Sequence, residues 1–254
     1  IVDYIDWSPF FHAWEMKGVY PKILNDKKYG DEARKLYEDG RSMLDNIISS
    51  RHLSAKAVIG IYPAYAKDEI VYSENVQFHF PRQRIDKGIN NSNYSLADFI
   101  APSNDYIGIF AVTTGYGVEE IVTKYKKQND DYNAIMVKII ADRLAEAFGE
   151  QLHEKVRREF WGYAYDEVLN TEELIKEKYR GIRPAPGYPA CPDHSEKDKI
   201  WEILSVKENT GIRLTETRAM VPAASVCGWY FSHPKSKYFS VGDQSTNTTN
   251  NKLL

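Results

Sequence analysis

The chain has 254 residues, of which 43% are hydrophobic and 27% are charged, and its formal net charge is −3 at pH 7. This is the composition of a globular protein that can bury a substantial core, and the slight negative charge offers no electrostatic attraction for nucleic acid or an anionic membrane. No apolar run approaches the roughly 18 residues that span a bilayer, and no signal-peptide pattern opens the sequence. We therefore expect no nucleic-acid and no membrane partner. Two cysteines do not make a disulfide framework, which favours a cytoplasmic location.

Hydrophobic periodicity in the first half of the chain predicts helices and strands in mixed order. Residues 1–24 are rich in aromatic side chains, and Pro9 and Pro21 interrupt any regular pattern, so we expect an irregular lead-in. Apolar residues at helical spacing follow, and then runs of β-branched residues and tyrosine, of which one contains Pro81 and is therefore expected at a sheet edge. The expected elements are a helix over 31–49, strands over 56–65, 69–73, 76–85 and 105–117, and a helix over 118–128.

The clearest single element is a long amphipathic helix over residues 131–161. Asp142, Glu146 and His153 lie on its polar side, which is typical of a solvent-exposed helix face. A second helix is expected over 171–179. The apolar stripe of the long helix consists of Met136, Ile140, Leu144, Phe148, Leu152, Val156 and Phe160.

A proline-rich segment, "RPAPGYPACPDHSEK" at 183–197, follows these helices. Its four prolines exclude a helix interior and a central strand and predict an extended, stiff loop. A helix is expected to begin at Ser195, with Asp198 completing a capping box, and strands are expected over 224–234 and 237–242.

Helices combined with antiparallel-looking strands, without a βαβ rhythm, predict an α+β fold that is not Rossmann-like. No linker forces a boundary, so we expect one domain over 1–242. The polar, asparagine-rich residues 243–254 are expected to be a disordered tail. Because the chain begins at Ile1 without a methionine, we also expect it to be a fragment of something longer.

Several common catalytic motifs are absent from the sequence. There is no P-loop, and "TGYGVEE" carries two of the three glycines of a dinucleotide fingerprint, which indicates a turn. A zinc site is a separate hypothesis, because zinc binds four cysteine or histidine ligands in tetrahedral geometry. The candidate ligands, which have no standard finger spacing, are Cys191, His194, Cys227 and His233.

The proline-rich loop combines side chains that suit a small ligand. Arg183 offers a planar cationic fork for a carboxylate or phosphate, and Tyr188 offers a flat face for stacking. A loop that proline has already stiffened loses little entropy when it binds. The loop therefore suits a ligand with an anionic end and a heteroaromatic ring. The alternative is a buried connector whose arginine pairs with a nearby acid such as Glu177.

The same loop, read as "GIRPAPGYPACPDHSEK", resembles the signature loop of the activation domain of cobalamin-dependent methionine synthase. Other stretches resemble that family in the same order, so the resemblance covers about residues 2–241. They are "YIDWSPFF" at 4–11, "YSLADFIAP" at 94–102, "DYIGIFAVT" at 105–113, "DDYNAIMVKIIADRLAEAFGEQLHEKVRREFWGYA" at 130–164 and "ASVCGWYFSHPKSKYFSV" at 224–241.

The resemblance implies a fold and a function. The fold is α+β, with helices around a long, curved antiparallel sheet. The domain binds S-adenosylmethionine and returns inactive cob(II)alamin to the catalytic cycle by reductive methylation, with an electron from flavodoxin or an equivalent donor. The cobalamin is carried by another domain of the same polypeptide, and zinc belongs to the full-length enzyme and not to this chain. As part of a methyltransferase, the isolated chain is not expected to synthesise methionine.

The resemblance also implies roles for particular residues. Asp6 meets the ammonium group of S-adenosylmethionine, and Arg183 holds its carboxylate. Backbone groups of Ala185 bind the adenine, and Tyr188 lies against the nucleoside. The remaining expected site residues are Tyr238, Glu146 and Glu177, the last two of which would face the cationic sulfonium.

The chain departs from the family pattern in two places. The family often has two tyrosines where this chain has Tyr238 and Phe239, and its helical C-terminal segment is replaced here by residues 243–254. These departures leave open a second function, a docking module for flavodoxin or the corrin domain that no longer binds the small molecule. A zinc-dependent hydrolase built on the cysteine and histidine candidates is a third possibility.

Overall fold

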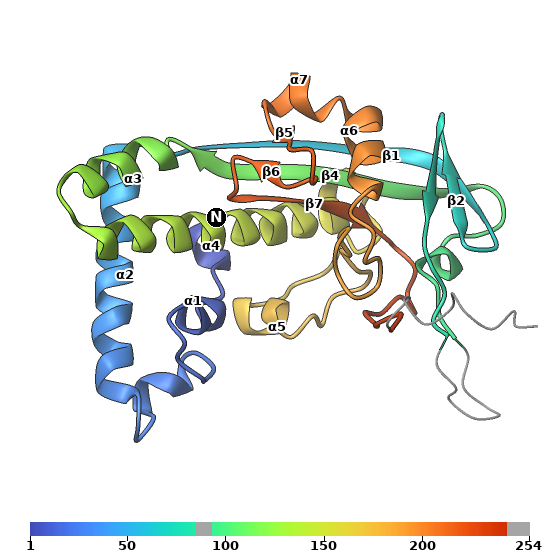
Figure 1. Cartoon of the computed structure of the whole chain (residues 1–254). Helices are drawn as coiled ribbons and strands as arrows, with labels where there is room; N and C mark the ends of the chain where they lie inside the picture. The colour runs from blue at the N-terminus through green and yellow to red at the C-terminus, as the bar shows by residue number, and fades with distance from the viewer. Residues whose placement is uncertain (85–92, 243–254) are drawn as a thin grey trace, which may run out of the picture. The chain divides into compact units, whose positions relative to one another are not determined.

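The computed structural model describes residues 1–84 and 93–242, and Figure 1 shows the arrangement of their helices and strands. The predicted disordered tail at 243–254 and the end of the strand predicted over 76–85 lie outside these residues. The chain divides into two compact units, and strands β1, β4 and β7 contribute residues to both. Unit 1 consists of Ile1–Val58, Ala111–Tyr179 and Val206–Val226, and unit 2 consists of Ile59–Phe110, Arg180–Ser205 and Cys227–Leu254.

The main sheet has five strands in the order β3-β2-β1-β4-β7. The predicted α+β fold with a curved antiparallel sheet is confirmed. Strand β3 is an edge strand and ends before Pro81, as expected, because proline cannot donate a hydrogen bond to a neighbouring strand. In the β1–β2–β3 meander, Tyr65 pairs with Tyr72 and Val71 with Phe78. The strands are β1 (Ser54–Lys67), β2 (Ile70–Ser73), β3 (Val76–His79), β4 (Asp105–Tyr116) and β7 (Ser225–Tyr230).

The helices of unit 1 pack around α4 (Asp131–Lys155), which contacts α1 (Ser8–Ala13), α2 (Gly30–Ser50) and α3 (Val118–Lys127) (Figure 1). Their shared core buries Phe10, Phe11 and Leu44. The helices predicted over 31–49 and 118–128 are confirmed. The predicted Gly-Tyr-Gly turn is also confirmed, because Gly117 has a φ of +96° at the N-terminus of α3. A side chain there would meet the His52 carbonyl oxygen at 2.1 Å, so only glycine fits.

The lead-in is more regular than expected. Pro9, which we read as an interruption, stands in the first turn of α1, where a missing backbone N–H costs nothing. Two 3-10 turns, Val2–Tyr4 and Lys22–Asn25, flank that helix. Short elements late in unit 1 were not predicted either: α7 (Val206–Thr210), and a two-stranded sheet of β5 (Arg213–Leu214) and β6 (Met220–Val221).

The long helix follows its predicted stripe up to Val156 and then changes its winding. A π-helix, Val156–Phe160, continues α4. Its wider turn moves later side chains around the axis, which leaves Phe160 52% exposed although the 3.6-residue period placed it in the core. The expected solvent-exposed face is wrong at His153, which is completely buried because the chain after the helix covers it.

Two other predicted elements differ in extent. Helix α5 (Thr171–Ile175) ends four residues before the predicted boundary, and Glu177 has a φ of +53°, which no helix residue adopts. Helix α6 (Glu196–Leu204) begins where expected, but Ser195 makes no side-chain cap, so the predicted capping box is wrong. The backbone N–H of Ser195 instead donates to Oδ1 of Asp193.

Unit 2 contains the β2–β3 part of the sheet, α6 and the proline-rich loop. Helix α6 contacts β3, and the Tyr62 hydroxyl donates to the Ile203 carbonyl oxygen at 3.2 Å. The strand predicted over 237–242 is not formed, and Phe239 instead lies 6.0 Å from Tyr94, measured between ring centroids.

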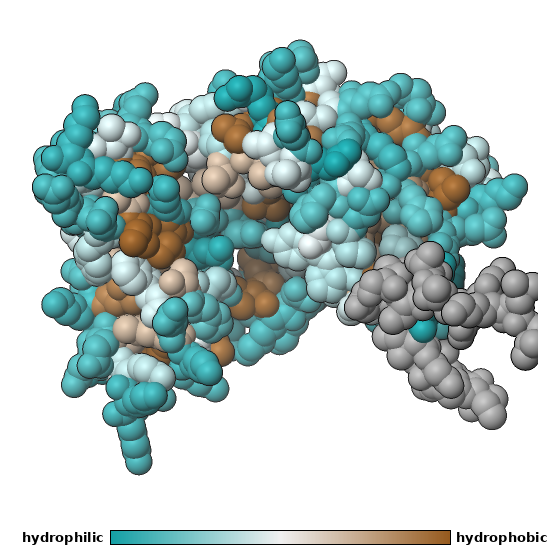
Figure 2. Space-filling view, viewed as in Figure 1, coloured by the Kyte–Doolittle hydropathy of each residue, from teal (hydrophilic) through white to brown (hydrophobic). Residues whose placement is uncertain are grey.

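None of the described helices combines the length and the apolar character that crossing a bilayer requires. On the face drawn in Figure 2, hydrophilic residues predominate and hydrophobic ones show as separate patches.

Candidate ligand-binding site

The proline-rich loop of unit 2 is irregular, as predicted, and backbone hydrogen bonds hold it in place. Ile182 pairs with Phe231 in an antiparallel bridge, and the Trp229 N–H donates to the Pro184 carbonyl oxygen at 3.0 Å. Further along, the Val241 N–H donates to the Pro189 carbonyl oxygen at 2.9 Å. Proline has no N–H but keeps its carbonyl, so the loop serves as an acceptor at both places. These bonds fix the backbone on either side of the candidate site.

Arg183 and Tyr238 come together in unit 2, although 55 residues separate them. The Arg183 N–H donates to the Tyr238 hydroxyl at 2.9 Å. The Arg183 side chain is half-buried, and its guanidinium carbon lies 6.0 Å from the centroid of the Phe110 ring. Contact with an aromatic face suits a guanidinium, which is more weakly hydrated than an ammonium group. The backbone of Arg183 is therefore held in place by Tyr238, and its guanidinium lies near an aromatic ring.

A turn over 185–188 presents the other two candidates of the loop. The Tyr188 N–H donates to the Ala185 carbonyl oxygen at 3.3 Å, and Gly187 has a φ of +90°. A side chain at Gly187 would lie 2.1 Å from the ring of His194, so the turn depends on glycine. Tyr188 is 56% exposed. The Ala185 N–H makes no backbone hydrogen bond within the described residues, and a ligand acceptor could use it.

The other three candidates belong to unit 1. Asp6 is half-buried, and its Oδ1 accepts a hydrogen bond from the Ser8 N–H at 2.8 Å, which leaves Oδ2 for a cation. Glu146 is half-buried on α4, and Glu177 is exposed just after α5.

A charged cluster at the end of α4 was not predicted. Arg157 is completely buried, and its guanidinium contacts Glu167 and the ring of Tyr179. Periodicity could not reveal it, because the sequence reads as two consecutive basic residues on a helix surface. The only available signal was an arginine next to the apolar stripe.

No group of three or more histidine, cysteine or acidic side chains in the described part of the chain is arranged to hold a metal. The two cysteine candidates for zinc are buried, and that burial raises the pKa of each thiol to about 12. Metal-binding cysteines are thiolates, whereas these environments favour the neutral thiol.

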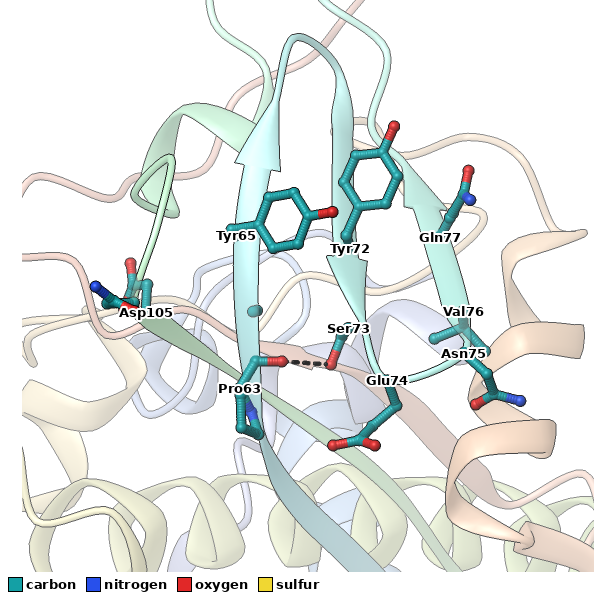
Figure 3. A pocket seen from close by; sticks show the side chains of 11 residues that line it. Pro63, Tyr65, Tyr72, Ser73, Glu74, Asn75, Val76, Gln77 and Asp105 are labelled. Carbon is teal, nitrogen blue, oxygen red and sulfur yellow. Dashed lines mark hydrogen bonds between the residues drawn. The ribbon is translucent and has the colours of Figure 1, made fainter.

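A separate open cleft of about 480 Å³ lies on the β1–β2–β3 meander of unit 2 (Figure 3). The rings of Tyr65 and Tyr72 stack there with centroids 4.9 Å apart and planes 7° apart, and the carboxylates of Glu74 and Asp105 also line the cleft. None of the predicted site residues lines it.

Comparison with known proteins shows one consistent relationship. Residues 1–251 match the family described as the vitamin B12 dependent methionine synthase activation domain. Among solved structures, the chain is similar to one described as the MetH reactivation domain bound to AdoHcy, with 50% identity and a TM-score of 0.90. That similarity covers 94% of this chain and 77% of the other.

Proposed function

The chain belongs to the family of activation domains of vitamin B12 dependent methionine synthase, and from this premise we propose that it binds S-adenosylmethionine and serves in the reactivation of the enzyme. The observation that carries the proposal is the similarity to a reactivation domain bound to AdoHcy, which is the demethylated form of S-adenosylmethionine. The stiff loop with its arginine, exposed tyrosine and available backbone N–H supports the same ligand.

The residues fit the chemistry of this ligand. Arg183 offers two parallel N–H donors to the carboxylate, and Oδ2 of Asp6 accepts from the ammonium group. The face of Tyr188 stacks on the nucleoside, and the Ala185 N–H donates to an adenine nitrogen. Tyr238 supports the site through its bond to the Arg183 backbone. Glu146 and Glu177 lower the energy of the positive sulfonium by adding negative potential.

We further propose that the domain works on a cobalamin carried by another domain of the same polypeptide. S-adenosylmethionine supplies the methyl group, and flavodoxin or an equivalent donor supplies the electron that reduces cob(II)alamin. This chain contributes by holding the two charged groups of the amino-acid part of the methyl donor, its ammonium and its carboxylate. Methionine synthesis itself belongs to the complete cytoplasmic enzyme, whose zinc lies outside this chain.

Isothermal titration of S-adenosylmethionine into the chain tests the proposal. We expect saturable one-to-one binding that Arg183→Ala and Asp6→Ala each weaken by at least about 10-fold, because each removes a charged partner of a ligand charge. Tyr106→Ala is a matched surface control, since Tyr106 is 48% exposed and is not a candidate site residue. A folded wild-type chain that shows no heat of binding would refute the proposal.

That negative result would instead favour a docking module for flavodoxin or the corrin domain. Exposed apolar side chains in unit 1, Tyr165 at 76% and Val168 at 86%, are the observation that favours this second function. Binding of flavodoxin by a chain that does not bind S-adenosylmethionine would establish it.

A further inference from the structure

The most unusual charge in unit 1 is the guanidinium of Arg157. It lies in the π-helix that continues α4, and its side chain is 0% exposed. Nε donates to Oε1 of Glu167 at 2.8 Å, and Nη2 lies 2.7 Å from the same oxygen. Nη1 lies 3.7 Å from Oε1 of Glu150. The guanidinium carbon stands 4.2 Å from the centroid of the Tyr179 ring.

Such a charge is stable in the interior only because its partners are buried with it. The side chains of Glu150 and Glu167 are 16% and 10% exposed, and Tyr179 is 9% exposed. Loss of Arg157 would leave two largely buried carboxylates without this counter-charge, which is strongly unfavourable. These contacts therefore favour one position for Glu167 and Tyr179 against Arg157.

The Tyr179 ring also contacts the ring of His153. The two rings meet edge to face, with centroids 4.9 Å apart and planes 79° apart. His153 and Arg157 both belong to the continuous helix formed by α4 and its π-turn, the longest helical element in the described residues. A ring that contacts both a cation and a second ring has little freedom to move.

The segment that carries Tyr179 has little regular structure of its own. Within the described residues, the five-residue helix α5 is the only regular element between Phe160 and Tyr179. Glu177 stands two residues before Tyr179 in a left-handed conformation, and Arg183 follows four residues after it. Side-chain anchoring, more than a hydrogen-bonded ladder, is therefore what holds the chain that leads into the candidate loop.

We propose that Arg157 is a positioning residue for ligand binding: by holding the Tyr179 ring, it sets the backbone of the unit 1 segment that carries the candidate site residue Glu177. This inference rests on the proposed function, because the ligand is S-adenosylmethionine. Arg157 does not itself need to touch the ligand. Its effect on affinity passes through Tyr179.

The test compares the dissociation constant of S-adenosylmethionine in matched variants whose folding is verified by circular dichroism. Arg157→Met is expected to weaken binding by about 10-fold, equivalent to about 1.4 kcal/mol. Arg158→Met is the control, because Arg158 stands in the same π-turn but is 42% exposed and pairs with Glu154. It should bind within about twofold of wild type, since an exposed ion pair contributes little.

A second pair of variants shows whether Arg157 affects the affinity through the Tyr179 ring. Tyr179→Phe keeps the ring and should bind like wild type, whereas Tyr179→Leu removes it and should weaken binding as Arg157→Met does. A purely structural role would lower the stability of these variants but leave the affinity of the folded molecules unchanged. The same pair decides the question if Arg157→Met does not fold.

Each outcome has a definite meaning. Folded Arg157→Met or Tyr179→Leu protein with wild-type affinity overturns the inference and leaves the proposed function standing. If the wild-type chain binds no S-adenosylmethionine, the proposed function fails. Amide hydrogen exchange over residues 161–179 then tests the anchoring itself. Faster exchange in Arg157→Met than in Arg158→Met supports it, and equal exchange overturns it.

Discussion

Gly228→Ala is a one-carbon change that tests how the proline-rich loop is packed in unit 2. A Cβ on Gly228 would lie 2.3 Å from the Pro184 carbonyl oxygen and 3.1 Å from Cε1 of Phe110. The first contact is with backbone, which cannot rotate away as a side chain can. The same carbonyl accepts the hydrogen bond of the Trp229 N–H, so the loop cannot retreat without stretching that bond.

The expected cost follows from these two contacts. Overpacking by one methyl group costs about 1 to 3 kcal/mol, and a weakened hydrogen bond costs about 0.5 to 1.5 kcal/mol. We therefore expect the free energy of unfolding to fall by about 1.5 to 4.5 kcal/mol in urea titrations followed by tryptophan fluorescence. The affinity for S-adenosylmethionine should fall as well, because Arg183 immediately precedes the displaced Pro184.

Gly162→Ala provides the matched control for this prediction. Gly162 has a φ of +74°, but no atom lies within 4 Å of the position that a Cβ would take. Its substitution should cost only the conformational penalty of about 1 kcal/mol. If Gly228→Ala destabilises the chain no more than Gly162→Ala does, the close packing of Pro184 on Gly228 is refuted.

Two further predictions concern ionisable groups. Burial raises the pKa of Asp98, but hydrogen bonds from Arg82 and the Ser95 N–H outweigh it and hold the pKa below its ordinary value. A depressed pKa stabilises the fold above the pKa of the unfolded chain, so Arg82→Met should lower the free energy of unfolding at pH 7 by about 1 kcal/mol. In urea titrations at a series of pH values, this difference should shrink as the pH falls below about 4, and a constant difference would contradict it. Burial also raises the pKa of the Cys191 and Cys227 thiols to about 12, so Ellman's reagent at pH 8 should modify neither in the native protein and both in denaturant. Immediate reaction of either native thiol would show that its burial is wrong.

Much of the fold could be predicted from local patterns. The alternation of residues 105–117 and the apolar stripe of 131–161 identified β4 and α4, because period and burial are directly linked in regular elements. The predictions were wrong where the conformation of a residue depends on its neighbours in space. Pro9 is as compatible with a first helical turn as with an interruption, and Glu177 ends α5 in a conformation that its residue type does not favour.

The candidate site, too, could be predicted only in part from the sequence. The loop's stiffness and its reactive side chains follow from composition, so Arg183 and Tyr188 could be singled out without a structure. The hydrogen bond between the Arg183 backbone and the Tyr238 hydroxyl could not, because it joins residues far apart in the chain. The roles of the seven predicted site residues toward the ligand remain predictions.

By itself, the sequence determined the α+β class, the positions of the long helices and strands, and a stiff loop with a cationic fork. All of these depend on backbone preferences and on periodicity, which act over a few residues. Only the tertiary structure decided that His153 is buried, that the helix widens into a π-turn, and that Arg157 is enclosed with two carboxylates and a ring. The reason is that the free energy of a buried charge depends on partners brought by distant segments, which no local pattern contains.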